Sequence, residues 1–207
     1  MGSEFLVYLR LGFEHIADVR GYDHILFIVA LTAMYPPREW LRVVVLVTAF
    51  TLGHTVTLAL ATLELVRIST VLVELLIPIT IIAAAGLNVV EVEWGRRRER
   101  VGGGDQASLE PRGGRLAKYG LALGFGLIHG LGFSNFLRAA LGAESSIVVP
   151  LLGFNIGLEV GQVAIVAAVI AATGVATGWL GLPRRGWTLV LSGATAVLSV
   201  GLVVERL

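Results

Sequence analysis

Histidine and carboxylate side chains stand in or beside the most apolar segments of this 207-residue chain. Four long apolar runs contain one ionisable residue each, namely His54, Glu74, His129 and Glu159. A shorter apolar run begins with two more, Asp23 and His24. An ionisable side chain inside a membrane span costs at least about 2.5–3.5 kcal/mol unless it is paired or faces water. Neutral imidazole and carboxylate together bind borderline divalent metals such as nickel, cobalt and zinc, so these residues are candidate metal ligands.

Three polar residues of one apolar run, Asn155, Glu159 and Gln162, are spaced i, i+4 and i+7 and therefore share one face of a helix. Amide side chains in membrane helices more often hydrogen-bond a neighbouring helix than bind a metal. We therefore keep Glu159 as a candidate ligand and assign Asn155 and Gln162 to supporting the ligands or lining a pathway.

A second polar stripe combines Glu74, Pro78 and Asn88 on another apolar run. A proline has no backbone N–H, so Pro78 leaves the carbonyl of Glu74, one turn earlier, without its helical partner. That carbonyl can then face a cavity. We assign Glu74 and Asn88 to the same supporting or pathway role.

The overall composition is that of a membrane protein. Hydrophobic residues make up 56% of the chain and charged residues 15%, against about 25% charged residues in an ordinary soluble domain. This composition excludes a disordered chain, a nucleic-acid binder and an ordinary soluble enzyme. Cysteine is absent, so a thiolate metal site is excluded as well.

Six apolar runs predict the fold. A helix needs about 20 residues to cross roughly 30 Å of hydrocarbon, and five runs reach or nearly reach that length. The sixth is short and becomes a span only if it starts near Gly21, which takes Asp23 and His24 into or near the membrane. The predicted fold is all-α, a polytopic bundle of six transmembrane helices: Gly21–Tyr35, Val43–Leu63, Ile68–Val90, Tyr119–Leu137, Ser145–Leu182 and Trp187–Val204.

Residues 1–20 precede these spans and form a separate element. Apolar residues recur there at helical spacing, which predicts a helix over Ser3–Ala17 that lies on the membrane face. Residues 21–207 then form a single membrane domain.

The loop over Gly95–Arg115 is basic and rich in glycine, and it determines the expected orientation. With this loop in the cytoplasm, 11 of the 16 basic residues lie inside and 5 lie outside, as the positive-inside rule requires. We therefore expect a multi-pass protein of the inner cell membrane with both termini outside the cytoplasm. In this orientation most of the polar residues within the spans fall in the outer half of the bundle.

Four ordered segments resemble the motifs of a known family. The segments are His15–Asp18 with Gly21–Phe27, then Phe50–Leu58, Gly126–Phe133 and Phe154–Gln162. They resemble the span motifs of the HupE/UreJ family of membrane proteins, and the resemblance covers nearly the whole chain.

The resemblance implies a nickel, or nickel and cobalt, permease. The functional positions that it implies are His15, Asp23, His24 and His129, with Glu74 as a weaker match. Seven residues separate His15 from Asp23 where nickel-linked members have five, and Gly132 stands where those members carry a carboxylate. The chain therefore resembles a second branch of the family.

The leading hypothesis is a permease that imports a divalent metal through a site open to the outer face. Its metal ligands are predicted to be His15, Asp23, His24, His54, His129 and Glu159. The expected partners are the metal ion, as substrate or ligand, and the lipid bilayer, with no organic cofactor and no nucleic acid; a homo-oligomer is left open. The same residues also suit an intramembrane zinc-dependent hydrolase, and a pore for a small neutral solute is the third hypothesis.

Overall fold

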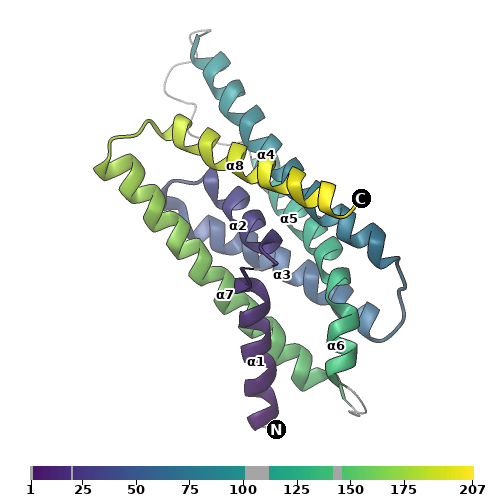
Figure 1. The fold of residues 1–207 in the computed structure, drawn as a ribbon. Coiled ribbons are helices and arrows are strands. Elements are labelled where there is room, and N and C mark those ends of the chain that lie inside the picture. The colour runs from purple at the N-terminus through teal and green to yellow at the C-terminus, as the bar shows by residue number, and fades with distance from the viewer. Residues whose placement is uncertain (1, 20, 101–111, 142–145) are drawn as a thin grey trace.

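A computed structural model describes residues 2–19, 21–100, 112–141 and 146–207 (Figure 1). Every regular element in these ranges is helical, which confirms the predicted all-α class. Four helices are long and apolar enough to cross a membrane, and a bent pair of helices is a fifth candidate. The protein is therefore a polytopic helical membrane protein with four to five candidate spans.

The four continuous candidates coincide with predicted runs. They are α3 (Trp40–Thr62), α4 (Thr70–Arg100), α7 (Val148–Gly174) and α8 (Arg184–Glu205). A short 3₁₀ turn, Pro37–Glu39, precedes α3, and a π-helical turn, Val175–Trp179, continues α7. Helix α4 extends to Arg100, so the loop predicted over Gly95–Arg115 begins later than expected. The rest of that loop up to residue 111 lies outside the described residues.

The fifth candidate is broken where the sequence predicted one continuous span. Helix α5 (Arg112–Gly132) and helix α6 (Ser134–Leu141) meet at an angle of 49°. Glycine and serine flank the break, and the Ser134 hydroxyl donates to the carbonyl of Leu131 at 2.9 Å, which competes with the regular helical pattern.

The remaining predicted span is a short helix, α2 (Asp23–Ala33), of 11 residues. At 1.5 Å per residue it is about 16 Å long, roughly half the thickness of the hydrocarbon layer. Six spans are therefore more than helix length and composition support.

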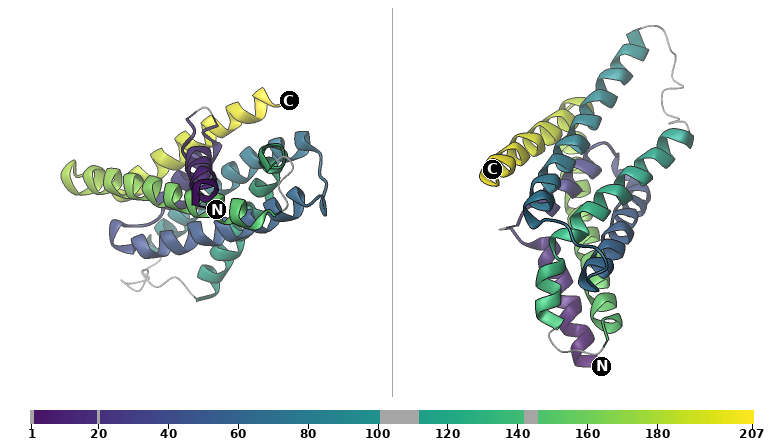
Figure 2. Two further views of the ribbon diagram at one scale, coloured as in Figure 1. Left: turned by 90° about the horizontal axis from the view of Figure 1, so that it is seen from below. Right: turned by 90° about the vertical axis from the view of Figure 1, so that its right-hand side faces the viewer.

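The predicted N-terminal helix is confirmed as α1 (Gly2–Ala17), but its packing was not expected. It runs parallel to α7 and touches its backbone, since a Cβ added at Gly12 would lie 1.9 Å from the Phe154 carbonyl oxygen. A Cβ at Gly157 would lie 1.8 Å from the carbonyl oxygen of Leu9. The chain then continues into α2, which also packs against α7. Figures 1 and 2 show α1 and α2 following one another beside α7.

A second close pair, α3 and α5, is held by the same kind of contact. A Cβ at Gly53 would lie 2.2 Å from the Leu123 carbonyl oxygen, and a Cβ at Gly126 would lie 2.1 Å from that of Phe50. Only glycine permits such an approach between helix backbones. Helix α7 also packs against α2 and α3, so the two close pairs meet and bring the histidine-carrying helices α1, α2, α3 and α5 together.

Candidate metal centre

The four histidines come from four different helices and meet inside the bundle. His15 lies in the last turn of α1 and His24 in the first turn of α2, while His54 is in α3 and His129 in the last turn of α5. The ring centroids of His15 and His24 lie 4.7 Å apart, and those of His24 and His129 lie 5.2 Å apart. The structure thus brings all four predicted histidines to one place.

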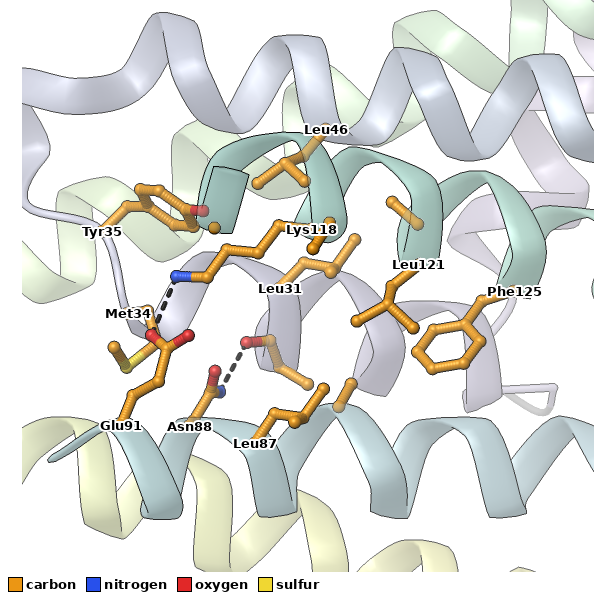
Figure 3. A pocket seen from close by; sticks show the side chains of 15 residues that line it. Leu31, Met34, Tyr35, Leu46, Leu87, Asn88, Glu91, Lys118, Leu121 and Phe125 are labelled. Carbon is orange, nitrogen blue, oxygen red and sulfur yellow. Dashed lines mark hydrogen bonds and ion pairs between the residues drawn. The ribbon is translucent and has the colours of Figure 1, made fainter. Parts of the chain in front are cut away.

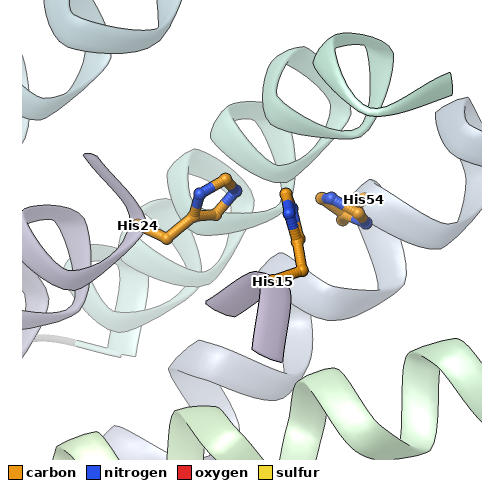
Figure 4. Close-up of side chains that lie close together, drawn as sticks. All are labelled: His15, His24 and His54. Atoms are coloured by element: carbon orange, nitrogen blue, oxygen red, sulfur yellow. The ribbon is translucent and has the colours of Figure 1, made fainter. Parts of the chain in front are cut away.

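Three of these histidines have the geometry of a metal site. One ring nitrogen from each of His15, His24 and His54 lies within 4.8 Å of the other two (Figure 4). No other such group of three histidines, cysteines or carboxylates occurs among the described residues. Small side-chain movements would bring the three nitrogens to about 2.0–2.1 Å from a shared zinc ion.

The ring nitrogens are buried and have no hydrogen-bond partner among the described residues. This holds for Nε2 of His15 and His24, for both nitrogens of His54 and for Nδ1 of His129. His54 is 0% exposed and His129 1% exposed. A buried polar atom without a partner destabilises a fold by about 1–3 kcal/mol. Several such atoms facing one another fit a site that binds a cation through nitrogen lone pairs.

The neighbour of His129 determines which of its nitrogens can bind a metal. The Thr80 hydroxyl lies 2.9 Å from His129 Nε2 and also 2.7 Å from the carbonyl oxygen of Ile77. The carbonyl can only accept, so it takes the single hydroxyl hydrogen, and His129 Nε2 must donate to Thr80. The lone pair of His129 is then on Nδ1, the nitrogen without a partner.

Aromatic rings pack against the histidines. Phe133 lies 3.9 Å from the His15 ring, and Phe27 and Phe50 each lie 5.1 Å from the His129 ring, measured between ring centroids. In such an apolar environment an ion needs protein ligands to replace its hydration shell. The centre therefore favours metals that bind imidazole over those that keep their water.

Two cavities lie near these rings. One, of about 600 Å³, is lined by His15 and Phe133 and by the acidic residues Glu14 and Asp18, of which Glu14 accepts a hydrogen bond from Arg10 at 2.7 Å. The other, of about 270 Å³, is bordered by the predicted pathway residue Asn88 (Figure 3).

The second cavity has an ion pair on its wall. Lys118 Nζ lies 2.8 Å from Glu91 Oε2, and Asn88 donates to the carbonyl of Ala30 at 2.8 Å. Phe125 lines the same cavity, and its ring packs 5.8 Å from that of Phe27. The ring of Phe27 thus packs against both Phe125 on the cavity wall and His129.

The short helix α6, which follows Phe133, is tied to the connection between α3 and α4. Arg138 donates to Glu64 at 2.6 Å, and the Asn135 amide donates to the Thr70 hydroxyl at 3.3 Å. Hydrogen bonds from Arg138 and Arg67 hold the pKa of Glu64 below its usual value. These contacts fix the helix that carries Phe136 beside the first cavity.

The polar residues of α7 make contacts with threonines of α3. Asn155 accepts from Thr55 at 2.6 Å and Gln162 accepts from Thr51 at 2.9 Å. Glu159 accepts from the Thr48 hydroxyl, and its other oxygen has no partner among the described residues. Asn155 and Gln162 therefore join two helices, whereas a ligand role for Glu159 stays a prediction.

Glu74 and Asp23 are joined by Arg206, a residue that the sequence analysis did not identify. The Glu74 side chain is exposed, but its backbone carbonyl accepts from Arg206 at 2.6 Å. Arg206 also donates to Asp23 at 3.1 Å, and Asp23 in turn accepts from the ring of His24 at 2.9 Å. Thr80 and Arg206 were missed because neither belongs to a spacing pattern with the histidines.

The sequence was also compared with known proteins. Residues 1–206 match the family described as HupE / UreJ protein. Neither the curated proteins nor the solved structures include a match to the chain. Because the family match covers nearly the whole sequence, the chain belongs to the HupE / UreJ protein family.

Proposed function

We propose that this protein is a permease that carries a divalent transition metal ion, nickel, cobalt or zinc, across the cell membrane. The main support is the meeting of His15, His24 and His54 inside a bundle of apolar helices, with ring nitrogens within 4.8 Å of one another. Imidazole is a ligand that all three metals accept. The association of HupE/UreJ proteins with nickel and cobalt uptake favours the same cargo.

The metal is the substrate, and the histidines replace its hydration shell during transit. Nitrogens of His15, His24 and His54 bind it, and His129 Nδ1 offers a fourth lone pair beside them. Asp23 supplies negative charge next to the centre. Glu159 is a further ligand along the route, with one carboxylate oxygen free of hydrogen bonds among the described residues.

The two cavities give the route a direction. The metal reaches His15 through the cavity that Glu14 and Asp18 line, and it leaves towards the cavity bordered by Asn88 and Glu91. The aromatic rings near the histidines and the second cavity must move for release. The protein therefore alternates between a state closed on this side and one in which the rings have turned aside.

Interrupted helices beside the histidines support a transport role. The chain breaks between α1 and α2, where His15 and His24 lie, and again between α5 and α6, just after His129. Transporters commonly build their binding sites from discontinuous helices, because irregular backbone is tolerated only where it lines a cavity. With the Gly95–Arg115 loop in the cytoplasm, as its basic residues predict, the His15 cavity faces outward and the direction is import.

Flux through the purified protein tests this function. We expect proteoliposomes with a metal-sensitive dye inside to take up nickel, cobalt or zinc, and His54→Ala to abolish the uptake. Thr177→Val is the matched control, since Thr177 bonds only the carbonyl of Thr173 in its own helix among the described contacts. If wild-type protein moves none of the three metals, or if His54→Ala transports like wild type, the permease proposal is wrong.

A zinc hydrolase is the second candidate, because three histidines also make up catalytic zinc sites. In that case the protein would bind zinc tightly without moving it across the bilayer. The flux assay therefore separates the two functions, since a hydrolase gives metal binding without uptake.

A further inference from the structure

Arg206, which directly follows α8, is connected to the metal centre through the first turn of α2. Its Nη2 lies 3.1 Å from Oδ2 of Asp23, whose other oxygen, Oδ1, lies 2.9 Å from Nδ1 of His24. The same Oδ1 accepts from the backbone N–H of His24 at 2.8 Å. Asp23 and His24 are both buried, at 8% and 6% exposure.

The other end of the Arg206 guanidinium is held by the backbone of α4. Its Nη1 donates to the carbonyl oxygen of Glu74 at 2.6 Å. That oxygen has no helical donor because the residue four positions later is Pro78, which has no N–H. The proline thus creates an acceptor, and Arg206 joins it to Asp23.

These contacts determine which nitrogen of His24 faces the centre. An ionised carboxylate can only accept hydrogen bonds, so the bond to Asp23 requires a hydrogen on His24 Nδ1. The lone pair is then on Nε2, which is buried and has no partner among the described residues. A carboxylate behind a metal-binding histidine fixes both the tautomer and the orientation of the ring.

We propose that Arg206 is a positioning residue of the metal centre, and that Asp23, held by Arg206, orients His24 rather than binding the metal. The assignment rests on the proposed metal-binding function, and it revises the ligand role that the sequence suggested for Asp23. Both carboxylate oxygens are engaged, one by the arginine and one by the ring. A metal could reach Asp23 only through the remaining lone pair of Oδ2, beside the Arg206 guanidinium, whose positive charge opposes it.

The two roles of Asp23 predict opposite effects of removing Arg206. If Asp23 were a ligand, the arginine would compete with the metal, and its loss would strengthen binding. Loss of a positive charge near a cation site also strengthens binding by itself. If Asp23 orients His24, the loss of Arg206 frees the carboxylate and the ring, and binding weakens despite the favourable change in charge.

Equilibrium cobalt binding to the purified protein shows whether the loss of Arg206 weakens or strengthens metal binding. We expect Arg206→Met to weaken binding by about 10- to 100-fold, the usual effect of losing a group behind a metal ligand. Arg206→Lys keeps the charge and a donor and should lose less. Arg67→Met is the control, because Arg67 pairs with Glu64 in the connection between α3 and α4. Unchanged or tighter binding by Arg206→Met would overturn the proposal.

A second measurement needs no metal. Nitrogen-15 NMR of the metal-free protein, with labelled histidine, distinguishes ring nitrogens that carry a hydrogen, and His24→Ala identifies the resonances of His24. We expect Nδ1 of His24 to carry the hydrogen in wild type and the two tautomers to mix in Arg206→Met. If Arg206→Met does not fold, Arg206→Gln is used with the same expectation. If the tautomer of His24 is the same in wild type and in the Arg206 variants, the positioning role is refuted, even if the permease proposal stands. If wild-type protein binds no metal, only the permease proposal is refuted.

Discussion

The backbone of Gly130 lies against that of His54, and a Cβ added at Gly130 would be 2.2 Å from the carbonyl oxygen of His54. Gly130 directly follows His129, so this contact sets the distance between two of the four histidines. Close packing of α5 on α3 is thus part of the metal centre as well as of the fold.

Gly130→Ala should therefore impair both stability and metal binding. The new methyl group forces α5 away from α3, and overpacking of this kind costs about 1–3 kcal/mol. Gly124→Ala is the matched control on the same helix, because nothing lies within 4 Å of a Cβ there. Thermal unfolding and cobalt titration of the two variants check this. Equal behaviour of both variants would show that the contact does not position His129.

Thr80→Val should weaken metal binding without unfolding the protein. Valine has nearly the shape of threonine but cannot accept from His129 Nε2, so the tautomer of His129 is no longer fixed. We expect a loss of about tenfold in affinity, measured by cobalt titration. Thr177→Val again serves as the control. If Thr80→Val binds cobalt like wild type, His129 does not bind the metal through Nδ1.

Thr55→Val tests whether the contacts between α3 and α7 only join the helices. It removes the hydrogen bond to Asn155. We expect a loss of about 0.6 kcal/mol of stability, the average for such bonds in membrane helices, and unchanged metal affinity. A large fall in affinity would instead place this contact within the metal pathway.

Cysteine labelling tests the orientation, and the absence of native cysteine makes the result unambiguous. A cysteine at Leu207, which is 89% exposed, should react with an impermeant reagent in intact cells. A cysteine at the exposed position Arg97 should react only after the cells are opened. The opposite pattern would invert the topology and make the proposed import an export.

Local chemistry allowed several of these features to be predicted from the sequence. The long apolar runs predicted the ends of α3 and α8 to within three residues, because burial in lipid requires an uninterrupted helix. The missing N–H of Pro78 predicted a free carbonyl at Glu74, and the structure pairs that carbonyl with Arg206.

Features that depend on tertiary contacts could not be predicted in this way. Arg206 meets Asp23 across 183 positions of sequence, and no spacing rule links them. The break at Phe133 falls inside an apolar run, so composition does not reveal it. The packing of α1 on α7 depends on Gly12 meeting the backbone of Phe154 and on Gly157 meeting that of Leu9, which a helical pattern in one segment does not specify.

Cobalt binding by the purified protein at neutral pH tests the central claim most directly. The account predicts one site per chain with the visible absorption of cobalt bound to several imidazoles, lost in His54→Ala. Protons compete with metal for imidazole, so the bound cobalt should be released on acidification. Wild-type protein that binds no cobalt, nickel or zinc, or a His54→Ala variant with the same spectrum as wild type, would contradict the account.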